Sequence, residues 1–480
     1  MPPQQNEGLT VSAATTEKAE TKTPYLANAS PSSSSFTSGS VTATCSVIEF
    51  GKSFHSTGIC FLDHMVDQLT SHAQIGVTMR VSIDGVLHQA HIDYASGSLA
   101  DRPHDRDIFI ACGAALGSSL KYLVNNISES VFCCPLDEAF AEARLTLSSD
   151  APYSLCDLAP YGSMPRQGRR WIGCYQCALT PVFFEHLVQT LGARLELRKM
   201  RGHNAHHVVE SSFKAFARVF RACLDGSSMG GSHGCVIIGE ERVRQDLLAT
   251  PNHRTGSRSR STKETTIKIH ADLDCPAPTA LTESIFTGVE LMDIILGEFR
   301  QTAGFNFSVH CDGDIYIDDH HTVEDVAITL GQCLNVALGN KAGLARMGCA
   351  EATSDSANVR CVVDLSNRPY FEWDLPLDEE YVGGDEEGFA AMRRGGENGK
   401  MLCGSALTCE MLQHVFESLT IETRATVHIE VLGDYKSSDG HTKNLAIASA
   451  RAYGTALREC VRIDPRRAGK VASSKGTLSV

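Results

Sequence analysis

Residues 202–210 read GHNAHHVVE and residues 317–325 read IDDHHTVED, so the pattern His-His-x-x-Glu occurs once in each half of the chain. After each pattern, over residues 208–223 and 323–338, apolar side chains recur at helical spacing. Each pattern is therefore predicted to open a helix, and Gly339 and Asn340 are typical of the end of the second one. Both histidines of a pattern lie about one helical turn before its glutamate, so the three side chains can converge.

Two imidazoles and a carboxylate on one helix face form a suitable ligand set for a divalent metal ion. Imidazole nitrogen suits Mn, Fe, Co or Zn, and the added carboxylate favours a harder ion such as Mn. The alternative is a histidine pair at a solvated helix start, where the helix dipole favours glutamate. Two patterns in one chain favour the metal interpretation, with Asn204, Asp318 and Asp319 capping the helices and orienting the imidazoles.

The two halves of the chain resemble each other. Residues 57–64 (TGICFLDH) pair with 287–294 (TGVELMDI), 146–153 with 363–370, and 183–187 (FFEHL) with 415–419 (VFESL). Residues 305–310 and 426–431 alternate between apolar and polar side chains, which predicts strands. We therefore expect an α/β (α+β) fold made of two tandem copies of one domain.

Composition excludes several classes of protein. The chain has 480 residues, 42% of them hydrophobic, and a formal net charge of −14. The length predicts two or three domains, and the negative charge argues against nucleic-acid binding and against binding to an anionic membrane. No apolar run is long enough to span a bilayer. The 18 scattered cysteines predict free thiols in a reducing compartment, which we take to be the cytoplasm.

The chain is expected to divide into four parts. Residues 1–40 are rich in Ser, Thr, Ala and Pro, which predicts disorder. Residues 41–224 form the first domain, 225–259 a linker, and 260–480 the second domain, with an acidic surface insertion near 378–399. A plastid transit peptide is the alternative interpretation of the N-terminal segment, but Glu7, Glu17 and Glu20 and the absence of arginine argue against it.

Several segments carry a resemblance to a known family. Residues 56–69, 204–218 and 318–325 resemble the signatures of imidazoleglycerol-phosphate dehydratase, and further matches are 135–139, 260–265, 364–370 and 473–478. The resemblance implies that each copy consists of two α/β half-domains, with helices packed between two four-stranded sheets. It also implies the dehydration of imidazole glycerol phosphate to imidazole acetol phosphate in histidine biosynthesis.

The chain departs from the family in where it keeps the metal ligands. By the resemblance, the first copy keeps His64, His206, His207 and Glu210, and the second keeps His320, His321, Glu324 and His414. The first copy lacks the pattern at 102–106 and has Val182 at the fourth-ligand position. The second copy has Ile294 in place of His64 and lacks the pattern at 444–448. The losses are complementary, so the resemblance implies composite sites with two Mn²⁺ ions, each ion taking about four of the eight ligands.

The resemblance also assigns residues to the substrate, a small phosphorylated imidazole. The phosphate-binding positions correspond to Arg346, Arg368, Ser474 and Lys475 in the second copy and Lys214 in the first. Further pocket positions are Gln68, His72 and Glu264, and Glu264 is also taken as catalytic. A carboxylate among the metal ligands, Glu210 or Glu324, is the hypothesised proton carrier.

Two alternatives stay open. The first is a non-catalytic tandem paralogue that assembles with, or regulates, an active dehydratase. The second is an unrelated dinuclear metallohydrolase, which the phosphate-binding matches and the lack of another nucleophile motif disfavour. Because family members form shells of about 24 domains, we expect a large homo-oligomer of about 12 chains.

Overall fold

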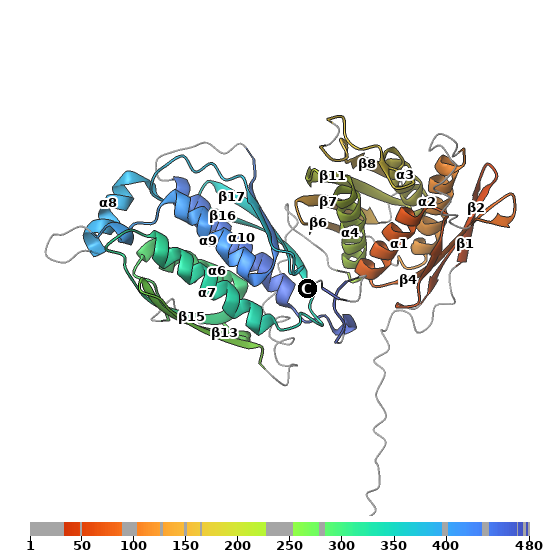
Figure 1. Cartoon of the computed structure of the whole chain (residues 1–480). Coiled ribbons are helices and arrows are strands. Elements are labelled where there is room, and N and C mark those ends of the chain that lie inside the picture. Colours follow the sequence, from red (N-terminus) through yellow and green to blue (C-terminus); the bar gives the residue numbers. More distant parts are fainter. Residues whose placement is uncertain are drawn as a thin grey trace, which may run out of the picture.

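The computed structural model describes residues 33–48, 50–88, 103–124, 128–147, 151–163, 166–226, 253–277, 284–395, 402–433, 441–467, 469–473 and 477–478. The two halves of the chain form two lobes (Figure 1). In each lobe, helices lie between two sheets, and the sheets repeat one topology. Their strand orders are β1-β2-β4-β3, β6-β7-β11-β8, β12-β13-β15-β14 and β16-β17-β19-β18. In every sheet the edge strand named last pairs in parallel with its neighbour.

The first lobe holds two of these sheets. The first sheet contains β1 (Ser33–Ser38), β2 (Val41–Ile48), β3 (Phe54–Ser56) and β4 (Gly76–Ile83), with β5 (Val86–Leu87) paired to β4. The second contains β6 (Glu129–Leu136), β7 (Ala139–Leu147), β8 (Tyr153–Asp157) and β11 (Ala193–Arg201). Between them lie α1 (Cys60–Ala73), α2 (Asp105–Lys121), α3 (Thr180–Leu191) and α4 (Ala205–Leu224), while β9 (Trp171–Ile172) and β10 (Tyr175–Gln176) pair separately.

The second lobe repeats this plan. Its first sheet contains β12 (Thr255–Ser261), β13 (Thr265–Pro276), β14 (Ile285–Phe286) and β15 (Phe305–Gly313). Its second contains β16 (Met347–Ser354), β17 (Ala357–Asp364), β18 (Tyr370–Trp373) and β19 (Thr426–Val431). The helices between them are α6 (Glu290–Ala303), α7 (His320–Leu338), α9 (Cys409–Thr423) and α10 (His441–Val461), with α8 (Gly384–Gly395) outside the layers. This architecture confirms the expected fold class.

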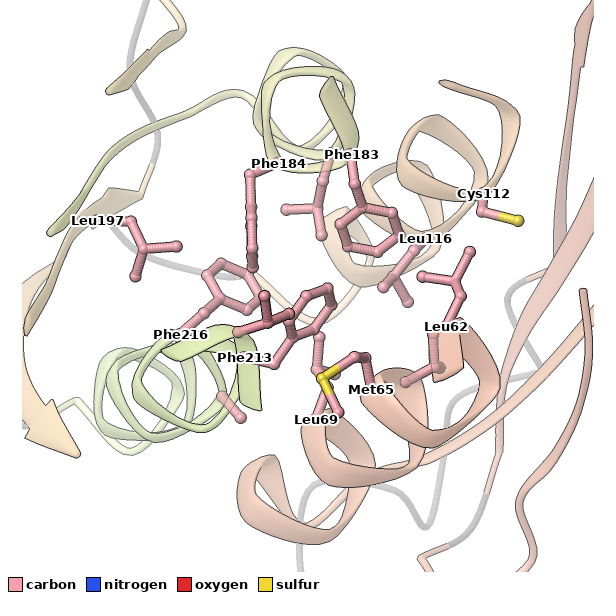
Figure 2. Close-up of a cluster of buried hydrophobic side chains, with 14 of the residues drawn as sticks. Leu62, Met65, Leu69, Cys112, Leu116, Phe183, Phe184, Leu197, Phe213 and Phe216 are labelled. Atoms are coloured by element: carbon pink, nitrogen blue, oxygen red, sulfur yellow. The ribbon is translucent and has the colours of Figure 1, made fainter. Parts of the chain in front are cut away.

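Aromatic side chains fill the core of the first lobe between the helices. Phe213 on α4 packs against Phe183 and Phe184 of α3, with ring centroids 5.3 and 4.8 Å apart. Leu62 and Met65 of α1 point into the same cluster (Figure 2). All five side chains are fully buried. This packing fixes α4, which carries one His-His-x-x-Glu pattern, against α1, which carries His64.

The second sheets of the two lobes face each other across a small apolar contact. Cys133 and Phe140 of the first lobe pack there against Cys349 and Val362 of the second. Around it, Arg360 on β17 lies 3.0 Å from Glu142 of the first lobe and also pairs with two carboxylates of its own lobe. Arg360 is largely buried, and its several carboxylate partners compensate its charge at the contact between the lobes.

The predicted helices and strands are largely confirmed. Helix α4 begins at Ala205, α7 spans His320–Leu338 and is followed by Gly339, and the predicted strands correspond to β15 and β19. Two expected boundaries were wrong, because β1 begins at Ser33, inside the segment taken as disordered, and β12 begins at Thr255, inside the expected linker. Both strands pair along their whole length with a neighbour, which Ser- and Thr-rich composition does not reveal. The rest of 1–40 and residues 227–252 lie outside the described residues.

The acidic insertion contains a helix. Helix α8 packs against the second lobe around a small cavity lined by Leu291, Ile294, Ala391 and Lys443, among others. Arg394 of α8 lies 2.9 Å from Glu290 at the start of α6. Helix α8 therefore lies beside Ile294, which is still 38% exposed and stands where the family resemblance leads us to expect a ligand histidine. None of the described helices is long and apolar enough to cross a bilayer.

Candidate metal centres

The first candidate centre lies where α1 and α4 meet. His206 Nε2 is 2.9 Å and His64 Nε2 is 3.5 Å from the same oxygen of Glu210, Oε2. One ligand atom from each of these residues lies within 4.8 Å of the others. His206 and Glu210 are four residues apart on α4, so helical geometry places them on one face. Two imidazole nitrogens and a carboxylate oxygen are a donor set that fits a divalent transition metal.

The start of α4 is held by a small polar network. Asn204, the N-cap, accepts a hydrogen bond from the backbone N–H of His206, at 2.9 Å. Its own backbone N–H donates to Glu138 Oε1, at 2.9 Å, and the other oxygen of Glu138 is 2.7 Å from His207 Nδ1. A carboxylate on Nδ1 makes it the protonated nitrogen, which leaves the lone pair of His207 on Nε2 available to a metal.

Charge at this centre is compensated by a lysine. Lys214 Nζ lies 2.6 Å from Glu210 Oε1, and both side chains are nearly buried. Burial by itself raises the pKa of Glu210, but Lys214 and the hydrogen bonds from His206 and His64 outweigh it and hold that pKa well below its usual range. Glu210 therefore stays a carboxylate, which suits a metal ligand.

The second candidate centre is built in the same way from α7 and α9. Glu324 Oε1 is 2.9 Å from His414 Nε2, and Glu324 Oε2 is 3.5 Å from His320 Nε2. These three residues form the second group whose ligand atoms lie within 4.8 Å of one another. His321 Nδ1 is 3.1 Å from Asp314 Oδ2, so Asp314 orients His321 as Glu138 orients His207. The two candidate centres thus have the same arrangement of side chains.

The two candidate centres are separate groups in the described part of the chain. Among the residues that the structure describes, no group of three or more candidate ligands combines residues of both lobes. The three donors of each group would fill half of an octahedral coordination shell.

Comparison with known proteins identifies the fold. The family model for imidazoleglycerol-phosphate dehydratase matches residues 57–220 and again residues 287–457. The chain belongs to this family. The two matches confirm the tandem duplication, and membership in a family of hydro-lyases confirms the expected enzyme class.

Relatives have about half the length of this chain. An imidazoleglycerol-phosphate dehydratase from Salinispora tropica is 36% identical over 47% of this chain and 99% of its own length. One from Pyricularia oryzae is 37% identical over 41% of this chain and 76% of its own length. A solved structure of the enzyme from Pyrococcus furiosus, in complex with (S)-C348, covers 46% of this chain and 100% of its own, at 25% identity and a TM-score of 0.33.

Residues expected to contact substrate in this dehydratase family gather beside the first centre, from both lobes. Gln68 Nε2 lies 3.4 Å from His64 Nε2. Arg368 of the second lobe reaches across the contact between the lobes, and its Nε donates to Asp137 Oδ1 at 2.7 Å. Asp137 in turn lies 3.8 Å from His207 Nε2. The second lobe therefore supplies a half-exposed arginine next to the candidate metal ligands of the first.

Two expected pocket residues are engaged internally. His72 is buried and its Nδ1 lies 3.3 Å from Nε of Arg218, so it is a neutral acceptor; burial and then Arg218 lower its pKa. Arg346 donates from Nε and Nη2 to both oxygens of Asp364, at 2.6 and 2.7 Å, and from Nη1 to the carbonyl of Ala472. These bonds occupy the bidentate edge of Arg346 that a phosphate would otherwise use.

Three residues expected to contact the substrate remain. One lies at the second centre, and two lie outside the described residues. Glu264 lies by the second centre, because its carbonyl accepts from the backbone of Asp314, at 3.0 Å, and its charge raises the pKa of His321, after the larger effect of the Asp314 hydrogen bond. Ser474 and Lys475 lie outside the described residues.

Sequence reasoning missed the two carboxylates that orient the histidines. Glu138 lies in the family match 135–139, and that match was the available signal, although no role was assigned to it. Asp314 precedes His321 by seven residues and follows a strand, and no spacing rule points to it. Both become visible only when the chain brings a loop beside a helix start.

Proposed function

We propose that this chain dehydrates imidazole glycerol phosphate to imidazole acetol phosphate in histidine biosynthesis, at composite sites formed between chains. In each site, the first centre of one chain (His64, His206, His207 and Glu210) faces the second centre of another (His320, His321, Glu324 and His414). The observation that carries this proposal is the pair of equivalent half-sites, each holding three converging ligands and one carboxylate-oriented histidine.

The eight residues would hold two divalent ions, and we propose Mn²⁺. Bound to the imidazole ring of the substrate, such ions would stabilise the negative charge that develops when a weakly acidic C–H proton is removed. The protein itself supplies the orientation. Glu138 and Asp314 fix two imidazoles, and Arg368 lies where it can meet the phosphate end of a substrate bound at the first centre.

Among the two candidate proton carriers, the structure favours Glu324. Glu210 is nearly buried and paired with Lys214, so its basicity is low. The contacts of Glu324 within the described chain are with His320 and His414, and it is exposed enough to face a partner half-site. An oxygen of Glu324 that is not bound to metal would accept the proton from carbon and return it in the later step.

The non-catalytic tandem paralogue is the second candidate. The Ile294 and Val182 substitutions favour it, because each lobe alone lacks half of the ligands. Turnover of the metal-stripped chain after manganese is restored separates the two candidates. Recovery of activity supports the composite enzyme, whereas a folded, metal-loaded chain without turnover supports the paralogue.

A site shared between chains predicts that two inactive variants restore activity when they are mixed. The variants His206→Ala and His320→Ala each damage a different half-site, so each should be inactive alone. After unfolding and refolding together in equal amounts, about a quarter of the sites should pair two intact half-sites, because partners are drawn independently. The measurement is turnover of the mixture against each variant alone. A mixture as inactive as its components would contradict a site shared between chains.

We also propose an oligomeric assembly and a cellular compartment for this chain. A site that needs two chains requires at least a dimer, and we propose the shell of about 12 chains that corresponds to about 24 domains. We place the enzyme in the cytoplasm, with a plastid as the alternative.

A further inference from the structure

Buried positive charge collects where the two lobes meet, next to the first metal centre. Lys214 lies on α4 of the first lobe, Arg346 precedes β16, and Arg467 ends the short helical turn Pro465–Arg467. These three side chains are only 4, 5 and 3% exposed. Arg218, one turn after Lys214 on α4, joins them and donates to the carbonyl of Ala345 at 2.9 Å. The backbone brings the C-terminal segment here, because Arg346 N–H donates to the carbonyl of Cys460.

Two of these cations are paired closely with a carboxylate. Lys214 pairs with Glu210 and Arg346 with Asp364, at 2.6 Å in each case. Each pair is neutral, as buried charges in folded proteins require. Arg467 has only a more distant carboxylate, Asp464, which it shares with Arg466.

Arg467 is different because its guanidinium edge is open. Among the residues that the structure describes, Nε and Nη2 of Arg467 have no hydrogen-bond partner although both atoms are buried. The closest carboxylate oxygen, Asp464 Oδ2, lies 3.5 Å from Nε and instead accepts a hydrogen bond from Gln74 of the first lobe. The other oxygen of Asp464 accepts from Arg466.

A buried guanidinium with two N–H groups that make no hydrogen bond is unfavourable in the ligand-free protein. Burial, followed by the neighbouring charge of Arg218, lowers the pKa of Arg467 to about 9. Arg218 itself is hydrogen-bonded to His72 and a carbonyl, and neither is an anion. A dianion bound among these side chains would remove the penalty, because it would supply several acceptor oxygens and the missing negative charge.

We propose that Arg467 binds the phosphate group of the substrate and positions it against the first metal centre. Its open Nε and Nη2 form the edge that grips two oxygens at once, and this is the edge that Asp364 already occupies on Arg346. The identity of the anion as the substrate phosphate rests on the proposed function, whereas the anion site itself does not. Free inorganic phosphate has the same chemistry and can occupy the same site.

Thermal unfolding of the whole chain with and without inorganic phosphate tests the site without any turnover. Phosphate should raise the Tm of the wild type, and Arg467→Gln should abolish most of that rise, while Arg467→Lys keeps part of it. The matched control Arg466→Gln removes a neighbouring arginine that is already paired with Asp225 and Asp464, and it should keep the full rise. A rise that is equal in wild type and Arg467→Gln, or absent from the wild type, overturns the proposal.

Steady-state kinetics then separates the two sources of phosphate. Arg467→Gln should raise KM for imidazole glycerol phosphate about 10- to 100-fold with little change in kcat, because a charge-assisted contact is lost from substrate and transition state alike. If the wild type responds to phosphate but shows no turnover, the proposed function fails and the anion site stands. A variant with lower Tm in the absence of phosphate, an unchanged phosphate response and an unchanged KM would show a purely structural role and contradict the assignment.

Discussion

At the scale of single residues, each candidate metal centre has a carboxylate beside it that orients one of its histidines. Glu138 joins the N-cap of α4 to His207, so one side chain fixes both the helix start and the direction of an imidazole. Asp314 plays the matching part for His321. The sequence indicated the ligands through the His-His-x-x-Glu spacing, but the orienting carboxylates depend on loop geometry that no local pattern encodes.

Glu138→Gln should weaken manganese binding at the first centre about 10- to 100-fold, because an amide holds the imidazole less firmly and polarises it less. Calorimetric titration of the metal-stripped chain with manganese measures this change. Glu129→Gln, on an exposed glutamate of β6, is the control and should bind manganese as the wild type does. Equal affinity in the two variants would show that Glu138 has no orienting role.

At the scale of elements, the long periodic segments were predictable and the edge strands were not. Helix α7 and strand β19 follow their patterns, because a buried face dictates the spacing of apolar side chains. Strand β1 reads SSSFTS and has no fully buried residue, so its conformation depends on pairing with β2. The fourfold recurrence of one sheet topology was equally hidden, because strand order depends on tertiary contacts.

Truncation of an aromatic core residue should show how much the packing of α4 contributes to the free energy of unfolding. Phe213→Ala removes a fully buried ring packed against α3, and we expect a loss of about 3–5 kcal/mol in the free energy of unfolding. Denaturant unfolding measures it. Phe389→Ala on α8, where the ring is 45% exposed, is the control and should cost much less. Similar losses would mean that the helix core relaxes without leaving a cavity.

At the scale of the whole molecule, a buried histidine couples the contact between the lobes to pH. His428 on β19 has a Nε2 that donates to the carbonyl of Asp137 in the first lobe, at 2.7 Å, while its Nδ1 is buried without a partner among the described residues. Burial lowers the pKa of His428 from 6.5 to about 4. The neutral ring is therefore required in the folded state.

The free energy of unfolding should fall as the pH drops from 6.5 towards 4. In this range His428 binds a proton in the unfolded chain but not in the folded protein. The loss from this residue is about 3 kcal/mol, and above pH 6.5 its contribution is constant. Denaturant unfolding across this pH range measures it. His428→Gln should flatten the profile, whereas His310→Gln, on an exposed position of β15, should not. A profile unaffected by His428→Gln would assign the acid sensitivity to other groups.

The complementary losses also have a consequence for inheritance. At the proposed composite sites each copy supplies a different half of the ligand set, so neither copy can be deleted without ending activity. Each copy can then diverge at the positions whose role the other copy fills. Helix α8 lies beside Ile294, the position at which the family resemblance leads us to expect a ligand histidine. On this proposal, duplication has left two copies that depend on each other, and one of them carries an additional helix beside a position that no longer supplies a ligand.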